Sequence, residues 1–197
     1  MAPYHKYVFD EKNRKLIGDF EGMYRAEDAE GFDSWYSADV RSLQTKLSLT
    51  LLADYNFSSV LEIGCGKGTI TQFLKRKNNR VMGIDISPTA IAKAKASFPD
   101  IEFRCLEGGR IGDLGERFDL VYIQTVLAYI PEWRNLLEQC AKLSKFCLVA
   151  EYVPTNAIGM VKSAADLIDC FSVHFSTEHK LLVDDDIVVV LGCSRCI

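Results

Sequence analysis

The chain has 197 residues, of which 48% are hydrophobic and 25% charged, and its formal net charge is −4. This length suffices for one domain with its own core, and the composition excludes an intrinsically disordered or fibrous protein. The acidic charge argues against a nucleic-acid partner, and no apolar run reaches the roughly 20 residues that span a bilayer, so no membrane partner is expected.

The first fifteen residues contain no apolar signal segment, which predicts a cytoplasmic protein. The chain has seven cysteines, an odd number with irregular spacing, and this pattern favours reduced thiols over a disulfide framework. Cys193 and Cys196 form a C-x-x-C pair, but only three histidines could complete a zinc site. We therefore expect no metal.

Residues 1–33 are polar and aromatic without a sustained period, and we interpret them as an irregular arm. From Ser34 onward, apolar residues recur at helical spacing, which predicts an amphipathic helix that ends near Tyr55. Residues 34–197 are predicted to form a single domain.

Short β-branched runs then alternate with helical patterns. Predicted strands cover 59–63, 80–85, 101–106, 118–123 and 146–152, and predicted helices cover 69–77, 88–98 and 131–144. A helix over 156–169 and strands over 171–183 and 187–196 follow, and the turn 184–186 is short enough to require an antiparallel hairpin. The predicted fold is α/β: a Rossmann-like, seven-stranded, mostly parallel sheet with a reversed last strand and helices on both faces.

Three alternate glycines follow the first of these strands. Gly64, Gly66 and Gly68 lie between the strand and a helical pattern that begins at Thr69. Glycine lets the backbone approach a ligand where a Cβ would collide, beside the free amide groups of a helix N-terminus. The loop is therefore predicted to cradle a nucleotide-like ligand.

An acidic residue supports this prediction. Asp85 ends the next predicted strand, about 20 residues after the loop, and ligands of open α/β sheets bind beyond the carboxyl ends of the strands. A carboxylate at this point can accept two hydrogen bonds from a ribose diol. The pair is more specific than either feature alone.

Three segments resemble the first, second and fourth motifs of class I S-adenosylmethionine-dependent methyltransferases: Glu62-x-Gly64-x-Gly66-x-Gly68, Gly83-x-Asp85-x-Ser87, and 118–121 with Val126-Leu127-x-Tyr129-Ile130-Pro131. The resemblance covers residues 59–150 and implies S-adenosylmethionine as the cofactor. In addition, segment 29–36 looks like small methyltransferases of glycan pathways, including nodulation-factor N-methyltransferases.

The resemblance implies a set of cofactor contacts. Glu62 and the loop would surround the methionine part of the cofactor, and Asp85 would hold the ribose. Glu107 stands where many relatives have an aspartate near the adenine amine. The implied cofactor residues are Glu62, Gly64, Cys65, Gly66, Gly68, Asp85, Ile86, Glu107, Gln124 and Thr125.

Candidate catalytic residues follow from the needs of methyl transfer. The acceptor must be held in line with the methyl group, and a hydroxyl acceptor needs a general base, whereas a neutral amine does not. Glu151 could take a proton, Tyr129 could orient the acceptor, and His174 could act as a base if its strand brings it to the cleft. Trp35 and Tyr36 could cover the acceptor. Each of these residues also has a structural interpretation, as a solvated carboxylate, a packing ring or a structural histidine.

These features predict methyl transfer to an oxygen or nitrogen of a small polar metabolite or glycan building block, by a monomer or homodimer. Acidic residues near the expected pocket mouth, Glu27, Asp28, Glu30 and Asp33, would repel phosphate. Two alternatives stay open. One is a non-catalytic module that binds the cofactor or a partner. The other is an NAD-dependent oxidoreductase, whose usual G-x-G-x-x-G spacing differs from this loop.

Overall fold

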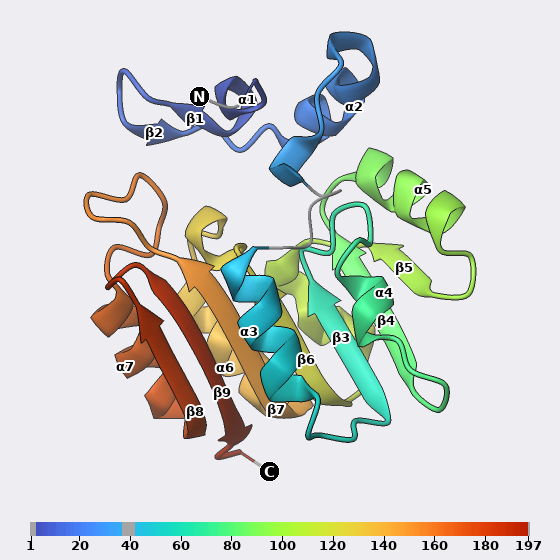
Figure 1. Ribbon diagram of the computed structural model, residues 1–197, viewed down its shortest axis with the longest axis vertical. Coiled ribbons are helices and arrows are strands. Elements are labelled where there is room, and N and C mark those ends of the chain that lie inside the picture. The colour runs from blue at the N-terminus through green and yellow to red at the C-terminus, as the bar shows by residue number, and fades with distance from the viewer. Residues whose placement is uncertain (1–2, 37–41, 197) are drawn as a thin grey trace.

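The computed structural model describes residues 3–36 and 42–196. In this part of the chain, a seven-stranded sheet has the order β5-β4-β3-β6-β7-β9-β8 (Figure 1). Its strands are β3 (Ser59–Ile63), β4 (Arg80–Asp85), β5 (Glu102–Cys105), β6 (Phe118–Gln124), β7 (Ser144–Tyr152), β8 (Phe175–Val183) and β9 (Ile187–Ser194). Strand β9 runs antiparallel to β7 and β8, and the other pairs are parallel. The predicted sheet is confirmed, including its reversed last strand.

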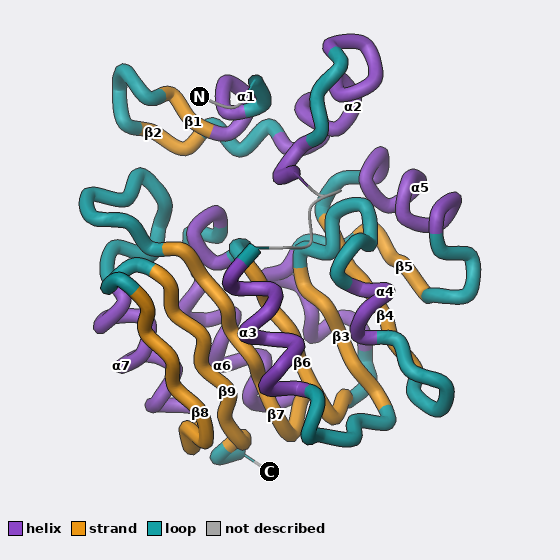
Figure 2. Tube along the Cα trace, viewed as in Figure 1, coloured by secondary structure: helices purple, strands orange, loops and turns teal. Residues whose placement is uncertain are grey.

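Helices cover both faces of the sheet (Figure 2). One face carries α3 (Leu43–Leu52), α4 (Thr71–Leu74) and α5 (Pro88–Ser97), and the other carries α6 (Trp133–Leu143) and α7 (Ala164–His174). Apolar residues of α6 at helical spacing, among them Trp133, Leu136, Leu137 and Cys140, are buried against the sheet. The 3-10 helices are η1 (Ser34–Tyr36), η2 (Gly108–Leu114) and η3 (Leu127–Tyr129).

The parallel strands end at one common edge of the sheet. Asp85 at the end of β4 pairs with Cys105 of β5, and Gln124 at the end of β6 pairs with Ala150 of β7. The loops that follow these strands therefore converge on this carboxyl edge, as the connection rules for parallel sheets require. The N-terminal arm lies across the same edge (Figure 1).

The arm is more regular than the sequence analysis predicts. It contains α1 (His5–Val8), a hairpin of β1 (Phe9–Asp10) and β2 (Lys15–Leu16), and α2 (Phe20–Glu30). Oδ1 of Asp19 caps α2 by accepting a hydrogen bond from the amide of Gly22 at 2.9 Å, and Gly31 ends the helix with φ of 69°. The interpretation as an irregular segment is wrong because these local capping signals outweigh the weak periodicity.

Two predicted helices also differ from the structure. The predicted helix over 34–55 is η1 followed by α3, because Trp35 has φ of 61° and breaks helical geometry there; residues 37–41 lie outside the described part. The predicted helix over 156–169 is α7, which begins later, where Oγ of Ser163 accepts a hydrogen bond from the amide of Asp166. Within the described residues, no helix has the length and apolar character needed to cross a membrane.

Candidate functional site

The glycine loop connects β3 to α4 at the carboxyl edge. Gly64, Gly66 and Gly68 have φ angles of 72°, 53° and 80°, in the left-handed region that favours glycine. A Cβ on Gly64 would lie 2.3 Å from Cγ2 of Val126, and one on Gly68 would lie 2.8 Å from Cζ of Phe103. Gly64 and Gly66 line a pocket, whereas Gly68 does not line it and is required by packing.

Asp85 fixes the loop from the end of β4. Its Oδ2 accepts a hydrogen bond from the amide of Gly66, and its Oδ1 accepts one from the amide of Ser87, both at 2.9 Å. Burial raises the pKa of Asp85 although these two donors oppose the shift. Each carboxylate oxygen has a second lone pair, so Asp85 can accept ribose hydroxyls while it holds the loop.

Glu62 lines the same pocket from β3. Its side chain is 3% exposed, and its Oε2 has no hydrogen-bond partner of adequate geometry in the described residues. Burial raises the pKa of Glu62 to about 8, against the opposing effect of the Thr71 hydroxyl. A buried carboxylate oxygen without a partner is costly, so this position suits the amino group of a ligand.

These groups open into one cavity with a volume of about 580 Å³. Ile86, which is 52% exposed, and Leu106 give it an apolar wall beside Glu107, and the three together suit an adenine ring. The residues of the implied cofactor set that line the cavity are Glu62, Gly64, Cys65, Gly66, Asp85, Ile86, Glu107, Gln124 and Thr125. The residues present therefore fit S-adenosylmethionine.

The residues after β6 are held firmly by the protein. Oε1 of Gln124 accepts a hydrogen bond from Tyr122 at 2.5 Å, and its Nε2 donates one to Oγ1 of Thr45 in α3 at 2.9 Å. Thr125 has φ of 54°, a strained conformation for a β-branched residue. The wall between the loop and α3 is therefore fixed before a ligand binds.

The arm and η1 give the cavity an aromatic roof. The ring centroid of Trp35 lies 5.1 Å from that of Tyr4 and 5.3 Å from that of Tyr129, and Phe20 lies 5.5 Å from Tyr129. All four rings line the cavity, which agrees with the covering role expected for Trp35. The side chain of Tyr36 lies outside the described part. Burial raises the pKa of Tyr129, so this phenol stays neutral and can donate a hydrogen bond but cannot act as a phenolate base.

Glu151 does not lie where the predicted base would have to be. It is fully buried on the α6 side of β7 and does not line the cavity. Its Oε1 accepts hydrogen bonds from the amides of Val126 and Leu127, both at 2.7 Å, and burial raises its pKa to about 7 against these donors. The structure therefore assigns Glu151 to holding the turn after β6.

His174 lies at the opposite edge of the sheet. It is the last residue of α7, and the next residue, Phe175, begins β8 opposite Ser194, the last residue of β9. Because β8 runs parallel to β7, its first residue lies at the amino edge, far from the cavity. The expectation that His174 reaches the cleft is wrong, because His174 precedes the amino end of β8 whereas the cavity lies at the carboxyl edge.

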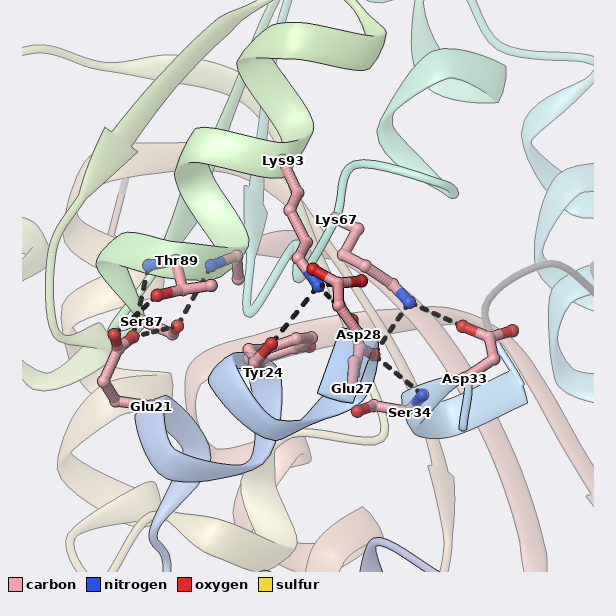
Figure 3. A network of polar contacts seen from close by, with 11 residues as sticks. Glu21, Tyr24, Glu27, Asp28, Asp33, Ser34, Lys67, Ser87, Thr89 and Lys93 are labelled. Carbon is pink, nitrogen blue, oxygen red and sulfur yellow. Dashed lines mark hydrogen bonds and ion pairs between the residues drawn. The ribbon is translucent and has the colours of Figure 1, made fainter. Parts of the chain in front are cut away.

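The sequence analysis did not predict the contacts that hold α2 against the glycine loop and α5 (Figure 3). Glu27 is 4% exposed and accepts hydrogen bonds from Lys67 of the glycine loop and Lys93 of α5, both at 2.8 Å. Tyr24 packs on the loop, since a Cβ on Gly66 would lie 2.7 Å from its hydroxyl oxygen. The spacing of Phe20, Tyr24 and Glu27 between Asp19 and Gly31 is the signal that could have revealed this helix face.

Comparison with known proteins agrees with this geometry. Residues 60–145 match the family model described as a methyltransferase domain. This segment, which is less than half of the chain, is therefore similar to a methyltransferase domain. The match spans β3 to the start of β7, so it includes the glycine loop, Asp85 and the end of β6, whereas the arm and the segment after β7 lie outside it.

Solved structures of methyltransferases share the fold of this chain. The N-methyltransferase NodS from Bradyrhizobium japonicum WM9, in complex with S-adenosyl-L-homocysteine, superposes with a TM-score of 0.70 at 19% identity, over 87% of this chain and 98% of that one. Magnesium protoporphyrin IX methyltransferase from Synechocystis PCC 6803, with bound S-adenosylmethionine, gives a TM-score of 0.66 at 17% identity, over 98% and 95% of the two chains.

Curated relatives match mainly in the domain core. A ubiquinone biosynthesis O-methyltransferase of Rhodopseudomonas palustris (strain HaA2) is 38% identical over 90 residues, 44% of this chain and 35% of that protein. A trans-aconitate 2-methyltransferase of Deinococcus radiodurans is 31% identical over 122 residues, 60% and 46% of the two chains. The matched region thus spans less than half the length of either relative.

Proposed function

We propose that the protein is an S-adenosylmethionine-dependent methyltransferase that acts on an oxygen or nitrogen of a small polar metabolite or glycan building block. The observation that carries this proposal is one continuous cavity of about 580 Å³, in which the cofactor cradle continues into a space under aromatic rings. This volume lies in the range of small-molecule sites, roughly 300–1,000 Å³. It has room for a cofactor and a small acceptor.

The cofactor, when bound, supplies an electrophilic methyl group on a sulfonium. Asp85 would hold the ribose hydroxyls, Glu62 would take the amino group of the methionine part, and the wall formed by Ile86 and Glu107 would take the adenine. Thr125, in the fixed wall, would bound the space beside the cofactor. The aromatic roof excludes water, which would compete with the acceptor.

The acceptor end of the cavity supplies orientation more than proton transfer. The carboxylates that line the cavity, in the described residues, are Glu62, Asp85 and Glu107, all on the side assigned to the cofactor. Tyr129 can orient an acceptor through its neutral phenol. This arrangement supports an acceptor that reacts without a protein carboxylate, such as a neutral amine or a readily ionised hydroxyl.

The proposed acceptor is small because the arm covers the cavity. Acidic residues of the arm are not a free negative rim: Glu27 and Asp33 pair with Lys67, and Glu30 pairs with Lys6. A phosphate-rich substrate is therefore disfavoured by the net charge of −4 alone. We propose a cytoplasmic monomer or homodimer that needs neither nucleic acid nor a membrane.

A screen of acceptors tests this function. Purified protein is incubated with S-adenosylmethionine and panels of amines, phenols, hydroxy acids and amino sugars, and released S-adenosylhomocysteine is measured. Turnover with a small acceptor, rising with pH through that acceptor's own pKa, supports the proposal. Efficient methylation of an oligonucleotide or a folded protein, with none of any small acceptor, would overturn it.

A further inference from the structure

The glycine loop contains a lysine, Lys67, that forms ion pairs with two acidic residues of the arm. Nζ of Lys67 lies 2.8 Å from Oε1 of Glu27 and 2.5 Å from Oδ1 of Asp33, and the lysine side chain is 19% exposed (Figure 3). Its neighbours in the loop are Gly66, whose amide binds Asp85, and Gly68. A movement of the loop therefore moves the group to which the arm is attached.

Glu27 joins this lysine to the backbone in front of Trp35. The same Oε1 that contacts Lys67 accepts a hydrogen bond from the amide of Ser34 at 2.8 Å. Hydrogen bonds from Lys67, Lys93 and Ser34 lower the pKa of Glu27 although burial opposes them, so the carboxylate is ionised. A buried, ionised carboxylate holds its partners firmly, because separation would leave its charge unpaired.

Trp35 needs such external support. Its φ of 61° and ψ of 13° place a bulky residue in the left-handed region, which persists only where the surroundings impose it. On one side its ring packs on Tyr129, and on the other its chain is fixed at Ser34 by Glu27. The position of the roof thus depends on the carboxylate that Lys67 holds.

We propose that Glu27 and Lys67 are positioning residues: they link the glycine loop to Trp35, so that cofactor binding and closure of the aromatic roof stabilise each other. The effect of this link on turnover rests on the proposed function. The link itself can be measured by binding of S-adenosylhomocysteine, without an acceptor. Thermodynamic linkage is reciprocal: if cofactor binding favours the closed roof, the closed roof must favour cofactor binding. A variant that releases the roof must therefore also lower the affinity for the cofactor.

Lys93 provides a matched control. Its Nζ lies 2.8 Å from Oε2 of the same Glu27, and its side chain is 25% exposed, close to the value for Lys67. However, Lys93 belongs to α5 and does not line the cavity. Replacement of Lys93 by methionine removes the same kind of charge from the same carboxylate without changing the glycine loop.

The experiment compares Lys67→Met, Lys67→Arg and Lys93→Met in a Trp133→Phe background, in which Trp35 is the remaining one of the two tryptophans. Titration with S-adenosylhomocysteine gives its Kd, acrylamide quenching gives the accessibility of Trp35, and urea unfolding gives stability. We expect Lys67→Met to raise the Kd about tenfold, within the usual range of coupling between sites, and to abolish the protection of Trp35 by the ligand. Lys67→Arg should restore both, and Lys93→Met should lower stability with a Kd within about twofold of the parent, as expected for an uncoupled site.

The other outcomes of this experiment would contradict the proposed link. The link through Lys67 is refuted if S-adenosylhomocysteine binds the parent protein but Lys67→Met and Lys93→Met lower its affinity equally. The link is also refuted if Trp35 is equally accessible in Lys67→Met and in the parent protein. In both cases the proposed function stands. If S-adenosylhomocysteine does not bind the parent protein at all, both the coupling and the proposed function fail.

Discussion

Oε1 of Glu151 lies 2.7 Å from the amide nitrogen of Leu127, and this contact fixes the turn that leads from β6 to Tyr129. The same oxygen accepts the amide of Val126, so one carboxylate oxygen satisfies two backbone donors. Leu127 is completely buried, and its amide has no access to water. Glu151 therefore contributes to the shape of the acceptor end although it does not line the cavity.

Glu151→Ala is expected to destabilise the protein by about 3 kcal/mol, because two amides lose their acceptor at a buried position. Glu151→Gln keeps a carbonyl oxygen for both amides and should cost only about 1 kcal/mol, with turnover within about threefold of the original protein. Urea unfolding and initial rates measure the two effects. A Glu151→Gln variant with unchanged stability and a loss of turnover of about 10²-fold or more would restore the general-base role.

Stability is expected to fall between about pH 5 and pH 8. Burial raises the pKa of Glu151 to about 7 and that of Glu62 to about 8, from an ordinary value of 4.5. In this window the folded protein binds more protons than the unfolded chain, so the free energy of unfolding decreases as pH rises. Carboxyls with a lowered pKa, such as Glu27, are ionised in both the folded and the unfolded chain above about pH 5. They therefore do not change the dependence of the free energy of unfolding on pH in this window.

Urea unfolding at pH 5, 6, 7 and 8 measures this slope. Glu62→Gln should reduce the decrease over the whole range from pH 5 to 8, because glutamine does not titrate, whereas Glu151→Gln should reduce it mainly below pH 7. A free energy of unfolding that rises steadily from pH 5 to 8 would show that these carboxyls are ionised at ordinary pKa values in the folded protein.

The carboxyl edge of the sheet could be predicted because its sequence signals are local. Asp85 ends a short β-branched strand, and Ser87 caps α5 with Pro88 in its first turn. Residues adjacent in the sequence therefore determine where this strand ends and this helix begins. Gly64 stands in a strand-to-helix turn with φ of 72°, a local conformation that favours glycine. Such constraints leave a mark on the sequence that needs no tertiary information.

The residues that sequence analysis misplaced depend on contacts distant in the chain. Glu151 is buried under a turn that precedes it by 24 residues, and nothing in its own strand distinguishes it from a carboxylate at a pocket. His174 alternates with apolar residues in a way that suits a strand, but it ends a helix that is buried through Leu167 and Phe171. The roof over the cavity likewise depends on Glu27 meeting Lys67, which is 40 residues away.

Gly64→Ala is expected to weaken S-adenosylhomocysteine binding by about tenfold or more, since backbone strain of roughly 1–3 kcal/mol adds to the collision with Val126. Gly115→Ala is the matched control: Gly115 has a similar φ of 65°, but no atom lies within 4 Å of its would-be Cβ. Calorimetric titration should show unchanged affinity for Gly115→Ala. Equal losses in the two variants would indicate a general effect on stability.

Binding of S-adenosylhomocysteine near pH 7 is expected to release protons. Glu62, with its pKa raised to about 8, is largely protonated in the free protein, and an amino group placed against it favours the carboxylate. Calorimetry in buffers with different ionisation enthalpies measures the number of protons released. Glu62→Gln should bind the ligand more weakly and reduce this number. Proton release of the same size in Glu62→Gln would assign it to another group.

The central claim, a cofactor site for S-adenosylmethionine built by the glycine loop and Asp85, is tested most directly by calorimetric titration with S-adenosylhomocysteine. We predict micromolar affinity, roughly −8 kcal/mol, and a loss of about 2 kcal/mol in Asp85→Ala, because hydrogen bonds to a charged acceptor disappear. NAD should give no heat. Absence of binding by S-adenosylhomocysteine together with saturable binding of NAD would contradict the account and favour an oxidoreductase.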